Sequence, residues 1–271
     1  MRAKIFKITV FSLFLFCTSL LNAGTLDEAL VKKQIQTVTN TKEMAALRCA
    51  ALKILVKEKA KAVIPVIKEI ALDTSADQKL RIMAIQSIPE YYPEIADDFI
   101  DMADKFFLLN LLPFEGDRAG ARWRKFNPKE LPYIIEFMYA LAKTGKSEAI
   151  PFFILPIRVK ETHHLTPLVM GEMGKPAVAF LLSMLEDEDP KTRKNAAISL
   201  GKIGDKRAVL ALVEMLKEDS NVTVRLEVAK NLVLLGDKKA IPFLEESKKN
   251  AKLDQEAKEL EKAIKALREK K

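Results

Sequence analysis

The chain has 271 residues, a formal net charge of +8, and a composition that is 49% hydrophobic but only 7% aromatic. Its 9 glycines and 12 prolines are few for this length, and alanine, leucine, isoleucine, lysine and glutamate dominate. This composition favours many helices, excludes a fold rich in strands, and is long enough for one large or two small domains.

Residues 1–23 differ in character from the rest of the chain. Three basic side chains within the first seven residues precede an uncharged apolar run, Ile8 to Leu21, and Ala23 supplies a small residue at a cleavage position. This is the pattern of a secretory signal peptide. The apolar run is short against the ~20 residues that span a bilayer. Cleavage after Ala23 is therefore favoured over the alternative of a retained membrane anchor.

Removal of the signal peptide takes away three positive charges and lowers the net charge from +8 to +5. Cys49 is then the single remaining cysteine, so no internal disulfide can form. These features favour an exported bacterial protein, located in the periplasm and separated from nucleic acid. A mildly basic chain keeps a weak attraction to anionic membrane surfaces or envelope polymers.

Residues 24–105 and 132–246 carry a repeated pattern. Glycines at positions 145, 174, 204 and 236 are spaced 29, 30 and 32 residues apart. Arginines at 48, 81, 193 and 225 stand at one phase of the repeat, and acidic turns precede the last two. A period near 30 residues is the signature of a helical solenoid.

Each repeat is predicted to contain two helices. In the stretch "DPKTRKNAAISLGKIG", Asp189 and Pro190 start a helix and Gly204 ends it. The following "DKRAVLALVEML" has apolar residues at helical spacing and forms the partner helix. Neither helix can bury its apolar stripe alone, but stacked pairs share one continuous core.

The residues from Asp189 to Gly204 and from Arg225 to Asp237 resemble HEAT repeats, specifically the short type named after phycobilisome lyases. The resemblance is sharpest between Gly171 and Glu246 and implies an all-α, right-handed α-α superhelix of about six helix pairs. It also implies that acids and arginines of the inter-helix turns form a structural ladder between repeats. The ladder residues are Asp77, Arg81, Asp189, Arg193, Asp219 and Arg225.

Two segments depart from the repeat. Residues 106–131 form an irregular insertion in which Trp123 lies among Arg118, Arg122 and Arg124. Aromatic and cationic residues together are typical of binding hot spots, although the alternative is a connector whose tryptophan fills the core. Residues 247–271 are predicted to form a capping helix and a charged tail.

Motifs that would carry chemistry are weak. "GKS" at Gly145 lacks the earlier glycine of a phosphate-binding loop, and the adjacent His163 and His164 lack the spacing of a helical metal chelate. The acids at 186–189 lie in a repeat turn, where they favour the N-terminal end of the next helix. The sequence therefore predicts no enzyme, no metal and no cofactor.

The favoured function is an exported non-enzymatic scaffold that binds a protein or peptide, and no nucleic acid, through the concave face of the solenoid. The resemblance implies that the second helix of each pair lines this face. Its outward positions are predicted to be Lys53, Gln86, Asn195, Ser199, Lys202, Glu227, Lys230 and Asn231. The alternatives are a chromophore-handling, lyase-like protein and a basic tether to the cell envelope.

Overall fold

The structure is a computed structural model that describes residues 27–91, 101–103, 105–106, 128–153, 156 and 160–270. Every regular element in these ranges is a helix, and none of the described residues forms a strand, which confirms the all-α prediction. The chain divides into two compact units, Met1–Tyr91 and Tyr92–Lys271. The predicted signal peptide lies outside the described residues.

The described part of the first unit, residues 27–91, contains two helix pairs. Its elements are α2 (Glu28–Thr39), α3 (Ala45–Lys57), η1 (Lys61–Val63), α4 (Ile64–Leu72), α5 (Gln78–Ser87) and η2 (Ile88–Tyr91). Arg48 of α3 donates from Nε to the carbonyl of Val38, at 2.7 Å, and Arg81 of α5 donates from Nε to the carbonyl of Ala71, at 3.1 Å. Each arginine thus joins its helix to the end of the preceding one.

The described part of the second unit is built from shorter elements before the regular repeats begin. These are η3 (Pro128–Glu130), α7 (Leu131–Lys143), η4 (Ser147–Phe153), α9 (Lys160–His163), α10 (Thr166–Gly171), η5 (Lys175–Ala177), α11 (Val178–Ser183) and η6 (Met184–Glu186). Phe106 stacks on Phe137 of α7 with ring centroids 4.3 Å apart and planes 10° apart. Both rings are fully buried and anchor the start of this unit.

The regular repeats follow at the C-terminal end. Their elements are α12 (Pro190–Ile203), η7 (Lys206–Ala208), α13 (Val209–Glu218), α14 (Val222–Leu235), η8 (Lys238–Ala240), α15 (Ile241–Lys249) and α16 (Asp254–Glu269). As predicted, Asp189 caps α12 through bonds from the amides of Lys191 and Thr192, both at 3.2 Å, and Gly204 ends α12 with φ 74°. A left-handed residue of this kind carries little strain only when it is glycine.

The partner helix of each pair begins differently from the sequence prediction. The stretch after Gly204 was expected to be one helix, but it opens with the 3₁₀ turn η7 and continues as α13. Asp205 accepts a hydrogen bond from the amide of Arg207 at 2.9 Å, and Asp237 accepts one from Lys239 at 3.0 Å in the next repeat. These capped turns redirect the chain before the α-helix starts.

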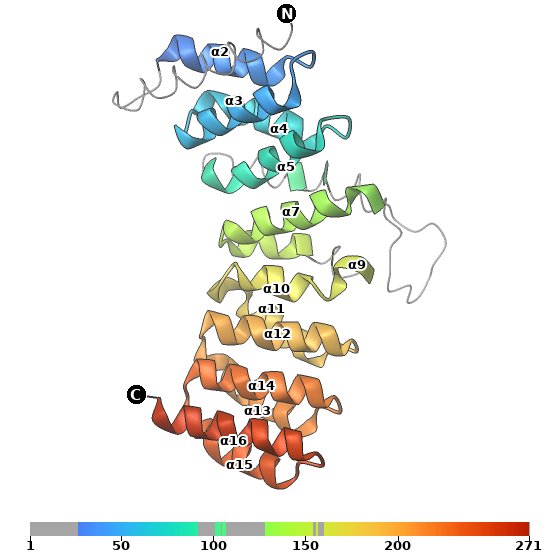
Figure 1. Ribbon diagram of the computed structural model, residues 1–271, viewed down its shortest axis with the longest axis vertical. Coiled ribbons are helices and arrows are strands. Elements are labelled where there is room, and N and C mark those ends of the chain that lie inside the picture. Colours follow the sequence, from blue (N-terminus) through green and yellow to red (C-terminus); the bar gives the residue numbers. More distant parts are fainter. Residues whose placement is uncertain are drawn as a thin grey trace, which may run out of the picture. The chain divides into compact units, whose positions relative to one another are not determined.

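The helices of the second unit form two layers (Figure 1). Helices α10, α12, α14 and α16 lie side by side in one layer, and α11, α13 and α15 lie behind them. Leu200 of α12, Leu212 of α13 and Leu232 of α14 are completely or almost completely buried between the layers. This is the stacked arrangement of an all-α solenoid, in which each pair completes the core of its neighbour.

The predicted capping helix corresponds to α16, although the predicted segment 247–271 begins inside α15. Helix α16 packs against α14 and α15 and buries Leu260, Ile264 and Leu267. Beyond it, Lys270 donates from Nζ to the carbonyls of Val233 and Leu234, at 2.8 and 2.7 Å, at the end of α14. Among the described residues, none of the helices is long and apolar enough to cross a membrane.

Candidate functional site

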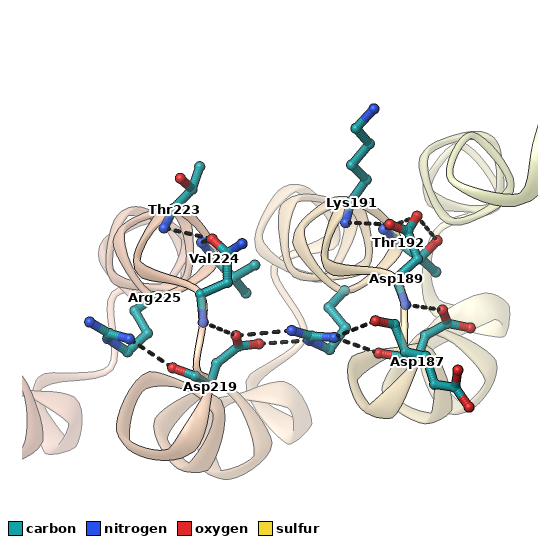
Figure 2. Close-up of polar contacts among 11 residues, drawn as sticks. Asp187, Asp189, Lys191, Thr192, Asp219, Thr223, Val224 and Arg225 are labelled. Carbon is teal, nitrogen blue, oxygen red and sulfur yellow. Dashed lines mark hydrogen bonds and ion pairs between the residues drawn. The ribbon is translucent and has the colours of Figure 1, made fainter.

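A ladder of ion pairs connects successive repeats along the turns before α12 and α14 (Figure 2). Arg193 donates from Nε and Nη2 to the two carboxylate oxygens of Asp219, at 2.7 and 3.0 Å. Its Nη1 donates to the carbonyls of Asp187 and Glu188, at 2.7 and 3.1 Å. Four of the five N–H groups of this guanidinium are therefore engaged. The hydrogen bonds to Asp219 raise the pKa of Arg193 above its ordinary value.

The next rung ends the ladder on α16. Arg225 donates from Nε and Nη2 to Oε1 of Glu256, at 2.9 and 2.5 Å, and from Nη1 to the carbonyl of Asp219, at 2.8 Å. The side chain of Glu256 is 3% exposed, and its Oε2 has no hydrogen-bond partner. The terminal helix thus supplies a carboxylate in place of a turn aspartate.

The sequence analysis did not identify Glu256, because no Gly-Asp turn repeats after residue 246. Its position relative to the arginine was the available signal. Glu256 follows Arg225 by 31 residues, and Asp219 follows Arg193 by 26. In both rungs the acid comes from the repeat or helix that follows the arginine.

Two of the three predicted turn acids, Asp189 and Asp77, cap helices, whereas the third, Asp219, accepts from the arginine of the preceding repeat. Asp189 does not pair with Arg193 but caps α12, and its pKa is lowered because bonds from Lys191 and Thr192 outweigh the effect of burial, the largest single contribution. In the first unit, Asp77 caps α5 through the amides of Lys79 and Leu80. A carboxylate at this position satisfies amides that the first helical turn leaves unpaired. Asp189 and Asp77 therefore stabilise the starts of their helices, and the ladder carboxylates come from Asp219 and Glu256.

Three residues predicted to face a binding groove are instead buried between helices of one layer. Asn195, Ser199 and Asn231 are only 8%, 1% and 2% exposed. Asn195 donates from Nδ2 to the carbonyl of His164, at 2.6 Å, and Ser199 donates from Oγ to the carbonyl of Pro167, at 2.9 Å. The prediction that these three side chains contact a partner is corrected: each one satisfies its polar atoms inside the protein, as buried polar groups must.

Close approach of neighbouring helices explains this burial. A Cβ added to Gly171 of α10 would lie 2.7 Å from Oγ of Ser199, and one added to Gly201 of α12 would lie 2.1 Å from Oδ1 of Asn231. A small residue on one helix thus faces a polar residue on the next, and the contact recurs in the following repeat. We call these two contacts the glycine seam. It leaves no space for solvent between α10, α12 and α14 at these positions.

The remaining predicted contact residues divide into two groups. Lys202 and Lys230 are exposed, and Glu227 is half-buried and pairs with Lys230 at 3.4 Å. Leu234, one turn beyond Lys230 on α14, is 56% exposed. We call Lys202, Glu227, Lys230 and Leu234 the α12–α14 face. In the first unit, Lys53 and Gln86 are exposed, and the insertion residues Arg118, Arg122, Trp123 and Arg124 lie outside the described residues.

Side chains that could react or bind a metal do not cluster in the described part of the structure. His163 is 13% exposed and contacts Oδ1 of Asp187 through Nε2, at 2.9 Å, so it fixes the turn that Arg193 also holds. Burial raises the pKa of the Cys49 thiol, which disfavours the reactive thiolate. Within the described ranges, no three His, Cys, Asp or Glu side chains gather in a way that could hold a metal ion.

Comparison with known proteins bears on the C-terminal repeats. Residues 178–268 match the family of HEAT repeats. The crystal structure of the Escherichia coli protein YibA shares 17% identity, with a TM-score of 0.46 and coverage of 90% of this chain and 82% of that chain. A crystal structure of an engineered protein shares 17% identity, with a TM-score of 0.31 and coverage of 88% of this chain and 96% of that one. No curated protein matches this sequence.

Proposed function

We propose, from the premise that residues 178–268 consist of HEAT repeats, that the chain is an exported, non-enzymatic scaffold that binds a protein or peptide partner through the α12–α14 face. HEAT repeats generally mediate protein interactions, because stacked helix pairs present an extended surface on rigid elements. The α12–α14 face consists of the predicted contact residues of these repeats that remain accessible, together with Leu234, which was not predicted. It replaces the wider set that included the buried seam residues.

The observation that supports this proposal most strongly is that α12 and α14 bury the polar residues of the glycine seam but leave the α12–α14 face accessible. At the glycine seam, Gly201 allows α14 to approach α12 closely, and Asn231 is buried there and hydrogen-bonded to Glu227 of its own helix. Leu234 nevertheless leaves more than half of its side chain in solvent, beside the charged Lys230 and Glu227. An exposed apolar residue surrounded by charged side chains on a rigid support matches the apolar centre and polar rim of a protein interface.

Charge reversal tests the use of this face. We expect the double change Lys202→Glu with Lys230→Glu to weaken binding of a co-purified partner at least tenfold, since both lysines are exposed and lie on adjacent helices. The matched control is Lys206→Glu with Lys238→Glu, which changes the same charge at equivalent exposed positions of η7 and η8. Equal binding by the two double variants would contradict the proposal.

Export is tested separately. We expect the mature chain recovered from cells to begin at Gly24, because the sequence around Ala23 has the features of a cleavage site. Intact mass measurement of the protein from the periplasmic fraction checks this. A full-length mass in the soluble cytoplasmic fraction would contradict export and leave the binding proposal standing.

A further inference from the structure

An open cavity of about 490 Å³ lies between the turn η6 and helix α13. Its apolar lining comes from Leu182 and Leu185 on one side and from Met215 on the other. Glu186, Glu214 and Glu218 are exposed and stand around this apolar floor. The cavity therefore combines an apolar surface with a carboxylate rim.

The lining of the cavity is mostly acidic, although the chain as a whole carries a net charge of +8. Of the lining acids, Asp219 pairs with Arg193 and Asp187 contacts His163. Arg193 donates its hydrogen bonds to Asp219 and to two backbone carbonyls. No ion pair within the described residues involves the three rim glutamates, Glu186, Glu214 and Glu218.

The lysine closest in sequence to the rim is directed elsewhere. Lys217 lies between Glu214 and Glu218 on α13, but its Nζ contacts Glu246 at 3.1 Å and lies 4.7 Å from the ring centroid of Phe243, both on α15. Lys217 of α13 therefore does not neutralise the rim glutamates. A cation from outside the repeat would complete it.

We propose that this cavity is a binding site for an arginine or lysine side chain of a basic peptide segment from another protein. The methylene stem of such a side chain packs on Leu182, Leu185 and Met215, and its charged end reaches the rim glutamates, as long basic side chains do when their stems are buried. The guanidinium of arginine also matches carboxylates in a two-point geometry. This site is independent of the α12–α14 face, so either one can fail without the other.

Peptide binding tests the proposal directly. The probe is a fluorescent octapeptide with two arginines among glycine and leucine residues, and its control carries citrulline, a neutral side chain of nearly the same shape, at both positions. We expect the arginine peptide to bind at least tenfold more tightly than the citrulline peptide, and to weaken as salt screens the attraction. Equal binding of the two peptides would overturn the proposal.

Paired substitutions locate the interaction. We expect Glu214→Gln with Glu218→Gln to reduce affinity for the arginine peptide at least tenfold while preserving the circular dichroism spectrum, because both side chains are exposed. The matched control is Glu28→Gln with Glu58→Gln, which removes two exposed carboxylates of the first unit. An equal loss in both double variants would show unspecific attraction to acidic surface and overturn the proposal.

Methionine-methyl NMR gives a readout at the cavity itself. Met215 is 7% exposed and lines the cavity, whereas Met44 is 47% exposed and belongs to the other unit. The arginine peptide should shift the Met215 methyl signal, assigned with a Met215→Leu variant, and leave that of Met44 in place. A shift at Met44 alone would contradict the proposal. Self-association of the unliganded protein that Glu214→Gln with Glu218→Gln abolishes would identify a second copy as occupant and overturn it too.

Discussion

The substitution Arg193→Ala probes the link between neighbouring repeats. It removes four hydrogen bonds at once, two to Asp219 and two to backbone carbonyls of the preceding turn. The side chains of Arg193 and Asp219 are 14% and 3% exposed, so the carboxylate would stay in a poorly hydrated position without its cation. The prediction concerns the free energy of unfolding of the C-terminal repeats.

The expected cost follows from this burial. Removal of one partner from a buried ion pair costs ~3–5 kcal/mol, because the other charge remains without compensation. Each charge-assisted hydrogen bond contributes ~1.5–3 kcal/mol by itself, so loss of the pair accounts for that range without the two carbonyl bonds. We therefore expect Arg193→Ala to lower the free energy of unfolding by ~3–5 kcal/mol. In an Asp219→Ala background the same change should cost less, because the unpaired carboxylate is absent.

Urea denaturation followed by circular dichroism measures these values. Arg207 is the matched control, since it also forms a two-point pair with an aspartate, Asp205, but its side chain is 64% exposed. Water solvates the guanidinium of Arg207, so this pair should contribute less than the Arg193 pair, although the side chain of Asp205 is 12% exposed. A loss for Arg193→Ala no larger than that for Arg207→Ala would refute the assignment of Arg193 as a structural rung.

Three further changes test other parts of the account. Gly201→Ala should destabilise the protein in urea denaturation, because its Cβ would meet Oδ1 of Asn231 at 2.1 Å, even though alanine is the better helix former by ~1 kcal/mol. The loss should be smaller in an Asn231→Gly background, and a stabilised Gly201→Ala variant would contradict the glycine seam. Hydrogen bonds from Arg207 lower the pKa of Asp205 to about 2, so the pair should contribute fully to stability above pH ~4, the ordinary range of aspartate, and lose that contribution as pH falls toward the lowered pKa. In an NMR titration the midpoint of Asp205 should rise in Arg207→Ala, and an unchanged midpoint would show that Arg207 does not lower this pKa. Trp123→Ala should weaken partner binding by ~2 kcal/mol or more with an unchanged melting temperature if residues 106–131 form a binding loop, whereas a loss of ~3–5 kcal/mol in stability would identify a core residue instead.

Features set by local sequence were predicted from the sequence. Asp189, Pro190 and Gly204 act through their own backbone geometry and immediate neighbours, so the start and end of α12 follow from the residues themselves. Gly236 ends α14 in the same left-handed conformation, with φ 70°. The repeat period and the all-α class follow from the same local signals, because each copy of the pattern produces the same turn.

Features that depend on a neighbouring helix were not predicted. A helical pattern distinguishes apolar from polar positions, and it assigned Asn195, Ser199 and Asn231 to the surface because they are polar. The burial of Ser199 and Asn231 arises from Gly171 and Gly201, which allow the adjacent helix to approach closely. Polar side chains buried by a neighbouring helix have no distinct pattern within their own helix.

In the ladder, too, the residues marked by local sequence were predicted and their distant partners were not. Arg193 and Arg225 were recognised by their repeated phase, but their carboxylate partners are supplied by the following repeat and by α16. Glu256 lies in a helix whose sequence resembles any charged surface helix. Its role follows from the geometry of the stack, in which Arg193 and Arg225 extend toward the next element.

The central claim, that the α12–α14 face binds a polypeptide partner, is tested most directly by site-specific photo-crosslinking in cells. The crosslinking residue replaces Leu234 on this face or Leu253 between α15 and α16, two leucines matched in exposure at 56% and 54%. We predict a discrete crosslinked product from position 234, absent from position 253 and lost when Lys202→Glu and Lys230→Glu are added. A product from position 253 with none from position 234 would contradict the account.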